Sequence, residues 1–159
     1  MVLKKRVTKL ELASALSDRT GISVNKANLF LDELINRVKY ELTINGNSVK
    51  LFGICNIYRM DGVNKRKVST GYLSNLIGEE GLVSRQEALM LEAEMSDIIS
   101  DLLKNGFRVV VTGLVSFEAK DGKVKCASSS SLRGSDCLIP CRVALDSLFR
   151  TMVKKGYVL

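Results

Sequence analysis

An internal repeat constrains this chain of 159 residues more than any other feature. The stretch from Leu42 to Ile57 has the same pattern as the stretch from Leu102 to Phe117, 60 residues later. In each stretch a helical pattern is followed by a glycine, then by alternating apolar residues, and then by a second glycine. The matched glycines are Gly46 and Gly106, followed by Gly53 and Gly113. A fixed period of this length predicts two copies of one supersecondary unit.

Each copy is predicted to begin with two helices. In the first copy, a capping box from Thr8 to Glu11 opens a short helix, and Ser23 opens a longer amphipathic helix. In the second copy, the short helix is expected to bury one face. The residues of that face are Tyr72, Leu76 and Ile77. A second capping box, from Ser84 to Glu87, opens the next long helix.

Paired strands follow each long helix, and the second copy then continues further than the first. The predicted strands are 48–52 and 54–59 in the first copy, and 108–112, 115–120 and 123–127 in the second. The additional material is predicted as an exposed Ser-rich arm at 128–136, a returning strand at 137–140 and a final helix at 142–155. The sequence therefore predicts an α+β chain of two units, 1–70 and 71–159, of which the first lacks the last helix.

The positive charge of the chain lies in its first half. Residues 1–70 contain 13 Lys and Arg against 6 Asp and Glu, whereas residues 71–159 contain 11 of each. A basic half can bind nucleic acid, and it can equally dock on the acidic surface of another protein. No signal peptide and no apolar run of membrane-spanning length are present, which predicts a soluble protein made in a cytoplasm.

The residue types argue against catalysis and against a metal site. The chain has no histidine, no phosphate-binding glycine loop and no nucleophile motif, so its cysteines, serines and acids have no base or orienting partner. Its four cysteines are expected to be reduced, and the spacing of Cys126, Cys137 and Cys141 lacks the CxxC pairs of structural zinc sites. We expect no enzyme activity, no cofactor and no small-molecule substrate.

Positions in both copies match one family pattern over nearly the whole chain. In the first copy these are Thr8, Glu11, Leu12, Leu16, Thr20, Gly21, Ser23, Ala27, Leu42, Gly46, Val49, Leu51, Gly53 and Ile57. In the second copy they are Gly81, Ser84, Ala88, Leu102, Gly106, Val109, Gly113, Phe117, Ile139 and Pro140. In their order and spacing the chain resembles the bacterial HU/IHF DNA-architectural family. Members of that family are intertwined dimers, so the resemblance implies a covalent pseudo-dimer.

The arm departs from that family. The resemblance implies an arm tip with a proline that wedges between base pairs, and such wedging favours DNA bending. The single proline, Pro140, matches the later Ile-Pro position, and the arm contains one basic residue, Arg133. Strong DNA bending by the family's mechanism is therefore not expected.

Two surfaces are candidates for binding. The basic residues on or near the predicted sheets and arm are Lys50, Arg59, Lys65, Arg66, Lys67, Arg108, Lys120, Lys123, Lys125 and Arg133. They would contact DNA phosphates, or they form a solvated face or a protein contact. The acidic residues of the second long helix are Glu87, Glu92, Glu94, Asp97 and Asp101. They form a solvated face, or they meet the basic half of a neighbouring subunit.

The leading hypothesis is a structural protein. Its fold, size and missing arm tip resemble the HU/IHF-fold ring proteins that stack below the portal in the tails of crAss-like bacteriophages. That resemblance implies a homo-oligomeric ring in a virion, with the portal or adjacent ring proteins as partners and no membrane contact. The alternative is an HU/IHF-like architectural protein in the bacterial cytoplasm or nucleoid, with DNA as its partner.

Overall fold

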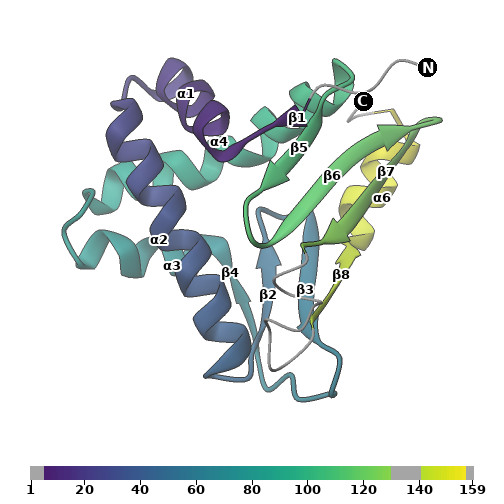
Figure 1. The fold of residues 1–159 in the computed structure, drawn as a ribbon, viewed down its shortest axis with the longest axis horizontal. Coiled ribbons are helices and arrows are strands. Elements are labelled where there is room, and N and C mark those ends of the chain that lie inside the picture. The colour runs from purple at the N-terminus through teal and green to yellow at the C-terminus, as the bar shows by residue number, and fades with distance from the viewer. Residues whose placement is uncertain (1–5, 130–140, 157–159) are drawn as a thin grey trace.

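The computed structural model describes residues 6–129 and 141–156, and within them it is an α+β fold. The helices are α1 (Lys9–Thr20), α2 (Val24–Thr43), α3 (Thr70–Glu79), α4 (Arg85–Lys104) and α6 (Ser147–Lys154). The strands are β1 (Arg6–Val7), β2 (Ser48–Leu51), β3 (Cys55–Arg59), β4 (Lys67–Ser69), β5 (Arg108–Val111), β6 (Val115–Lys120), β7 (Lys123–Ser128) and β8 (Cys141–Leu145). Figure 1 shows α1 to α4 gathered on one side of the strands. The predicted α+β class is confirmed.

Serine side chains begin both long helices, as the sequence predicts. The Ser23 hydroxyl accepts the N–H of Lys26 at 3.2 Å at the start of α2. At the start of α4, the Ser84 hydroxyl accepts the N–H of Glu87 at 3.1 Å, and the Glu87 carboxylate accepts the N–H of Ser84 at 3.0 Å. The capping box of α4 is therefore complete.

The capping box predicted for α1 is wrong. Thr8 precedes the helix, but its hydroxyl accepts no backbone N–H and instead donates to the Glu11 carboxylate at 3.3 Å. Burial of Leu12 and Leu16 holds α1 in place without that cap. The helix ends at Gly21, which adopts φ 77°.

Two four-stranded sheets result from an exchange of strands between the halves of the chain. One sheet has the order β1-β5-β6-β7, and the other has the order β4-β2-β3-β8. The strand before α1 runs parallel to β5, which follows α4, and the strand before α3 runs parallel to β2, which follows α2. Each pair of helices is therefore preceded by a strand that pairs with the hairpin following the other pair. The predicted boundary after residue 70 falls at the start of α3.

The last strand and helix correct the sequence prediction for residues 142–155. Cys141–Leu145 is the strand β8, antiparallel to β3, and α6 begins only at Ser147. The Asp146 carboxylate caps α6 by accepting the N–H groups of Leu148 at 3.1 Å and Phe149 at 3.3 Å. The predicted strand at 137–140 and all but the first two residues of the predicted arm at 128–136 lie outside the described residues.

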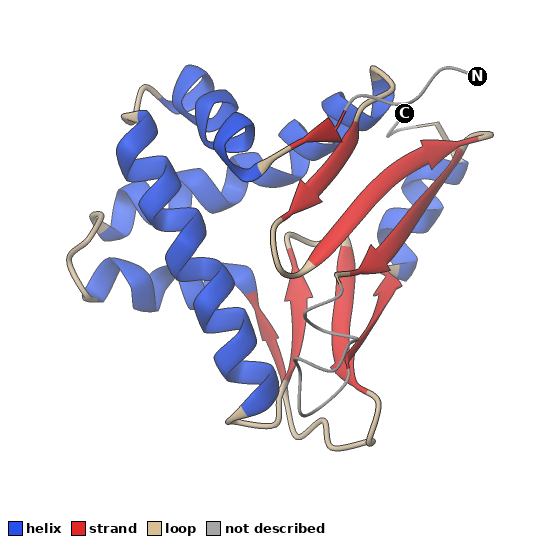
Figure 2. Cartoon of the chain, in the orientation of Figure 1, coloured by secondary structure: helices blue, strands red, loops and turns tan. Residues whose placement is uncertain are grey.

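One hydrophobic core joins both halves. Its largest fully buried side chains come from α1, α2, α3, the β2–β3 hairpin and β6, and they include Phe30, Leu34, Leu51, Ile57, Leu73 and Phe117. Figure 2 shows the helices packed beside and behind the strands. On α3 the inward residues are Leu73 and Ile77, whereas Tyr72, predicted to face inward, is 47% exposed. Tyr72 directly precedes the buried Leu73, so its side chain lies beside the buried stripe of the helix and not in it.

The turns between strands follow the glycine pattern of the sequence. In the β6–β7 hairpin, Asp121 and Gly122 both adopt positive φ, of 53° and 72°, which suits a tight hairpin turn. Between β2 and β3, Gly53 adopts φ 72°, as predicted from the repeat. No helix within the described residues has the length and apolar character needed to cross a membrane.

We predict that Ser84→Ala lowers the free energy of unfolding by about 1 kcal/mol, the usual effect of losing a helix cap. The matched control is Thr8→Ala. It removes an N-cap hydroxyl that accepts no backbone N–H. Chemical denaturation of the two variants and the parent measures both effects. An equal loss in both variants would contradict the difference between the two caps.

Candidate assembly and anion-binding surfaces

The outward face of the β1-β5-β6-β7 sheet is rich in cations. Four of the predicted basic residues are exposed on it: Arg108, Lys120, Lys123 and Lys125. The pairing register sets Lys120 opposite Lys123, and it sets Arg108 beside Arg6. Only Lys125 faces an acid, Glu118. Like charges on neighbouring strands destabilise a sheet, so this face favours an anionic partner.

The outward face of the other sheet carries fewer cations. Lys50 lies on β2, and its ammonium is 3.7 Å from the carboxylate of Asp146. Lys50, Arg66 and Lys67 border a shallow hollow of about 340 Å³ together with Tyr72. Arg142, which sequence reasoning missed, is exposed on β8 opposite Tyr58. The sequence pattern placed Arg142 in a helix. The pairing of β8 with β3 shows that Arg142 lies on the outward face of this sheet.

Arg59 has a structural role. Its guanidinium binds the Asp61 carboxylate through Nε at 3.1 Å and through a second nitrogen, and it also contacts the carbonyl oxygen of Leu42 at 3.5 Å. The hydrogen bond from Arg59, followed by that from the N–H of Val63, lowers the pKa of Asp61. Arg59 is thus engaged within the β3–β4 connection, unlike Lys65 and Arg66, which are exposed in it. Arg133 lies outside the described residues.

The acidic residues of α4 meet the basic half of the same chain. The Glu87 carboxylate is 3.1 Å from the ammonium of Lys26, and Arg19 contacts both Glu94, at 3.5 Å, and Asp101. These contacts join α4 to α1 and α2. Two of the predicted acids make no ion pair with the described residues: Glu92, which accepts a hydrogen bond from the Thr70 hydroxyl at 2.9 Å, and Asp97, which is exposed. Asp97 has no partner among the described residues.

A groove of about 470 Å³ lies beside Asp97, where α4 meets α6 and the β2–β3 turn. Its apolar lining is Phe52, Leu148, Phe149 and Met152. Leu148 is 65% exposed, and Met152, one helical turn further, is also exposed. We call this surface the α6 groove.

A second group of exposed apolar side chains lies where α2 ends. It comprises Tyr40 from α2, Ile44 just after that helix, and Met60 and Val63 from the β3–β4 connection. The two segments are adjacent, because the N–H of Lys65 donates to the carbonyl oxygen of Gly46 at 2.8 Å. Together with Lys65, these four residues form what we call the α2-end patch. Sequence reasoning missed both surfaces, since their apolar residues come from segments far apart in the chain.

The described part of the chain contains no group of three or more His, Cys, Asp or Glu side chains that could hold a metal ion. Cys55 and Cys141 are buried, and Cys126 is partly buried, while Cys137 lies outside the described residues. Burial raises the pKa of the Cys55 thiol well above its ordinary value, with a smaller effect from Cys126. A buried protonated thiol of this kind packs as a small apolar group.

We predict that protonation of Glu87 destabilises the fold in acid. The N–H of Ser84, and then the Lys26 ammonium, lower the pKa of Glu87 below the ordinary value of about 4.3. Because the folded-state pKa is the lower one, this contribution to stability is complete above about pH 4.3 and is lost as the pH falls through the folded-state pKa. The free energy of unfolding, measured against pH, should decline less steeply below about pH 4.3 in Glu87→Gln than in the parent. Identical slopes would show that Glu87 is not the responsible group.

No protein-family model matches the chain, and no curated protein matches it either.

Proposed function

We propose that the chain is a non-enzymatic structural protein that assembles with copies of itself into a ring. The observation that carries this proposal is the presence of two different exposed apolar surfaces, the α6 groove and the α2-end patch. Exposed apolar patches rimmed by polar groups are typical of protein interfaces. The described part of the chain offers such a surface at two places.

The proposed contact would pair a hollow surface with a projecting apolar one. The groove is lined by Arg19, Asp101 and Lys104 besides Asp97, and Arg19 is paired with Asp101. The α6 groove is a hollow in which Asp97 has no ion-pair partner from residues 6–129 or 141–156, whereas the α2-end patch has exposed apolar side chains beside the exposed cation of Lys65. The apolar groups of one copy would fill the groove of the next, and Lys65 would approach Asp97. Burial of the apolar groups would supply most of the free energy, and the charges would set the register.

A contact between two different surfaces leads to rings. The α2-end patch lies at the lower end of the molecule in Figure 1, away from α6, so each copy in such a contact retains one free groove or one free patch. Head-to-tail contacts of this kind close into a ring when the rotation permits, and otherwise they form filaments.

The more specific proposal places this ring in a bacteriophage particle, next to the portal, at the head–tail connector or in the tail. It rests on the resemblance to the HU/IHF family and on the departure of the arm from that family. The portal and adjacent ring proteins would then be the other partners. The protein would be made in the bacterial cytoplasm and would act in the virion.

Light scattering of the purified chain tests the assembly. We expect a mass several times the 17.5 kDa of one copy. Ile44→Asp in the patch and Leu148→Asp in the groove should each reduce the mass to that of a single copy, because a buried unpaired carboxylate opposes association. The matched control is Leu10→Asp, a similarly exposed leucine, 61% accessible, outside both surfaces.

Mixing the two interface variants makes the test specific. The Ile44→Asp copy keeps its groove and the Leu148→Asp copy keeps its patch, so the mixture should form dimers and nothing larger. A parent protein that remains a single copy, or interface variants that assemble like the parent, would contradict the proposal.

A second candidate function is DNA binding, favoured by the cationic face of the β1-β5-β6-β7 sheet. Neighbouring cations at Lys120 and Lys123, and at Arg6 and Arg108, create a positive potential suited to phosphates. In this alternative the chain is an HU/IHF-like architectural protein of the nucleoid. The same face would also suit an acidic protein.

Duplex DNA distinguishes these possibilities. If the face binds DNA, the logarithm of the association constant should fall steeply with the logarithm of salt concentration, and Lys123→Ala should reduce that slope by about 1. Lys39→Ala, which removes the same charge from α2, serves as the control. A ring protein that uses the face for protein contacts should show little salt-sensitive affinity.

A further inference from the structure

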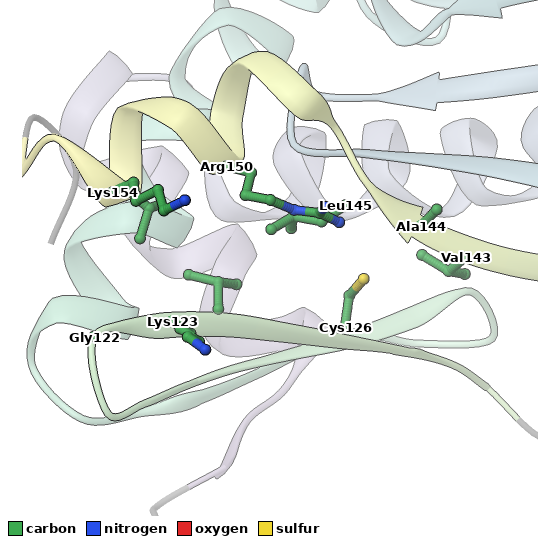
Figure 3. Close-up of a pocket in the computed structure, with 10 residues that line it drawn as sticks. Gly122, Lys123, Cys126, Val143, Ala144, Leu145, Arg150 and Lys154 are labelled. Carbon is green, nitrogen blue, oxygen red and sulfur yellow. The ribbon is translucent and has the colours of Figure 1, made fainter.

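A separate cavity lies between the two sheets where β7, β8 and α6 meet. Its volume is about 540 Å³, within the range of roughly 300–1,000 Å³ that small-molecule pockets occupy. The apolar side chains that line it are Val124, Cys126, Val143, Leu145 and Val153. Figure 3 shows these lining residues between α6 and β8 on one side and β7 on the other. The apolar part of this lining suits an aliphatic group.

Two cations from α6 border this cavity, and Lys123 of β7 also lines it. Arg150 and Lys154 lie one helical turn apart, and Figure 3 shows the Arg150 side chain running along the cavity toward Leu145. Among the described residues, no carboxylate lines the cavity, and neither Arg150 nor Lys154 forms an ion pair. An arginine with no acidic partner in this part of the chain, beside an apolar space, is suited to a carboxylate, which it can bind through two parallel hydrogen bonds.

The thiol of Cys126 belongs to the same site. Figure 3 shows it pointing from β7 into the space between the two sheets. Burial raises the pKa of this thiol, and the nearby Arg150 acts in the opposite direction to a smaller extent. The thiol is therefore uncharged near neutral pH, and it leaves the positive charge of Arg150 available to a ligand.

We propose that this cavity binds a small amphipathic anion, an aliphatic carboxylate whose chain enters the apolar interior while its head group meets Arg150 and Lys154. The site is independent of the assembly proposed above, since it lies on the side of α6 that carries Val153 and not on the side that carries Leu148. Polyanions such as DNA have no apolar part to fill the interior, so they do not fit the lining.

Calorimetric titration of the full chain with decanoate, at concentrations where decanoate forms no micelles, tests the proposal. We expect saturable binding of one decanoate per chain, weaker binding of the shorter hexanoate, and no measurable binding of the cation decyltrimethylammonium. Arg150→Glu should weaken decanoate binding by about tenfold or more, because it removes charge-assisted hydrogen bonds and adds repulsion. The matched control is Arg142→Glu, the same change on the outward face of β8.

Thiol labelling provides a second readout. In a Cys137→Ser background, Cys126 is the one remaining cysteine that is not buried. Decanoate should slow the reaction of Cys126 with a disulfide reagent in the parent and leave it unchanged in Arg150→Glu. Equal binding of decanoate and decanol would show an apolar cavity without anion selectivity and would overturn the proposal. Undiminished binding by Arg150→Glu, or labelling that decanoate does not affect, would also overturn it.

Discussion

Two strand pairings, β1 with β5 and β3 with β8, hold the halves of this chain together. The first is parallel and places the buried Val7 at the edge of the β5–β6 hairpin, and the second is antiparallel and adds β8 to the β2–β3 hairpin. Each sheet thus contains one strand from the other half of the chain, so neither sheet is complete without both halves. The continuous core follows from this arrangement, since the helices of both halves cover the same pair of sheets.

The same arrangement divides the charges of the chain. Contacts between α4 and the helices of the first half use Arg19 and Lys26 to neutralise acids of the second half. The cations on the sheet faces have few such partners. Exposed cations therefore lie on strands of both halves, such as Lys67 on β4 and Lys123 on β7, although composition assigns the excess of positive charge to the first half. In an intertwined fold, the net charge of a sequence segment therefore does not tell which surface of the molecule carries that charge.

Local sequence patterns predicted the local structure well. The long helices begin at Ser23 and Ser84, and the positive φ angles at the repeated glycines follow from short-range sterics. The errors arose where a local pattern suits two structures. Apolar residues at Val143 and Leu145 fit a helix and a strand equally, and pairing with β3 decides between them.

The binding surfaces were less predictable for a related reason. Lysines on predicted strands can be counted from the sequence, but which residues lie beside them depends on how the strands pair. No local sequence pattern indicates that Arg6 lies beside Arg108. The groove, the patch and the cavity each combine side chains from at least two distant segments. Periodicity identifies which residues face the core, and it gives no information on which exposed residues become neighbours.

The exchange of strands also constrains how the protein is made. A ribosome synthesises the chain from its first residue, and β1 has no partner until β5 has emerged, after two pairs of helices have been completed. The β2–β3 hairpin can pair with β8 only later, because β8 is synthesised after β5. Folding that depends on such distant contacts is slow, and the nascent chain exposes unpaired strand edges in the meantime. The early helices, α1 with its buried leucines and α2 with its Ser23 cap, are thus the part of the molecule that can form first during translation.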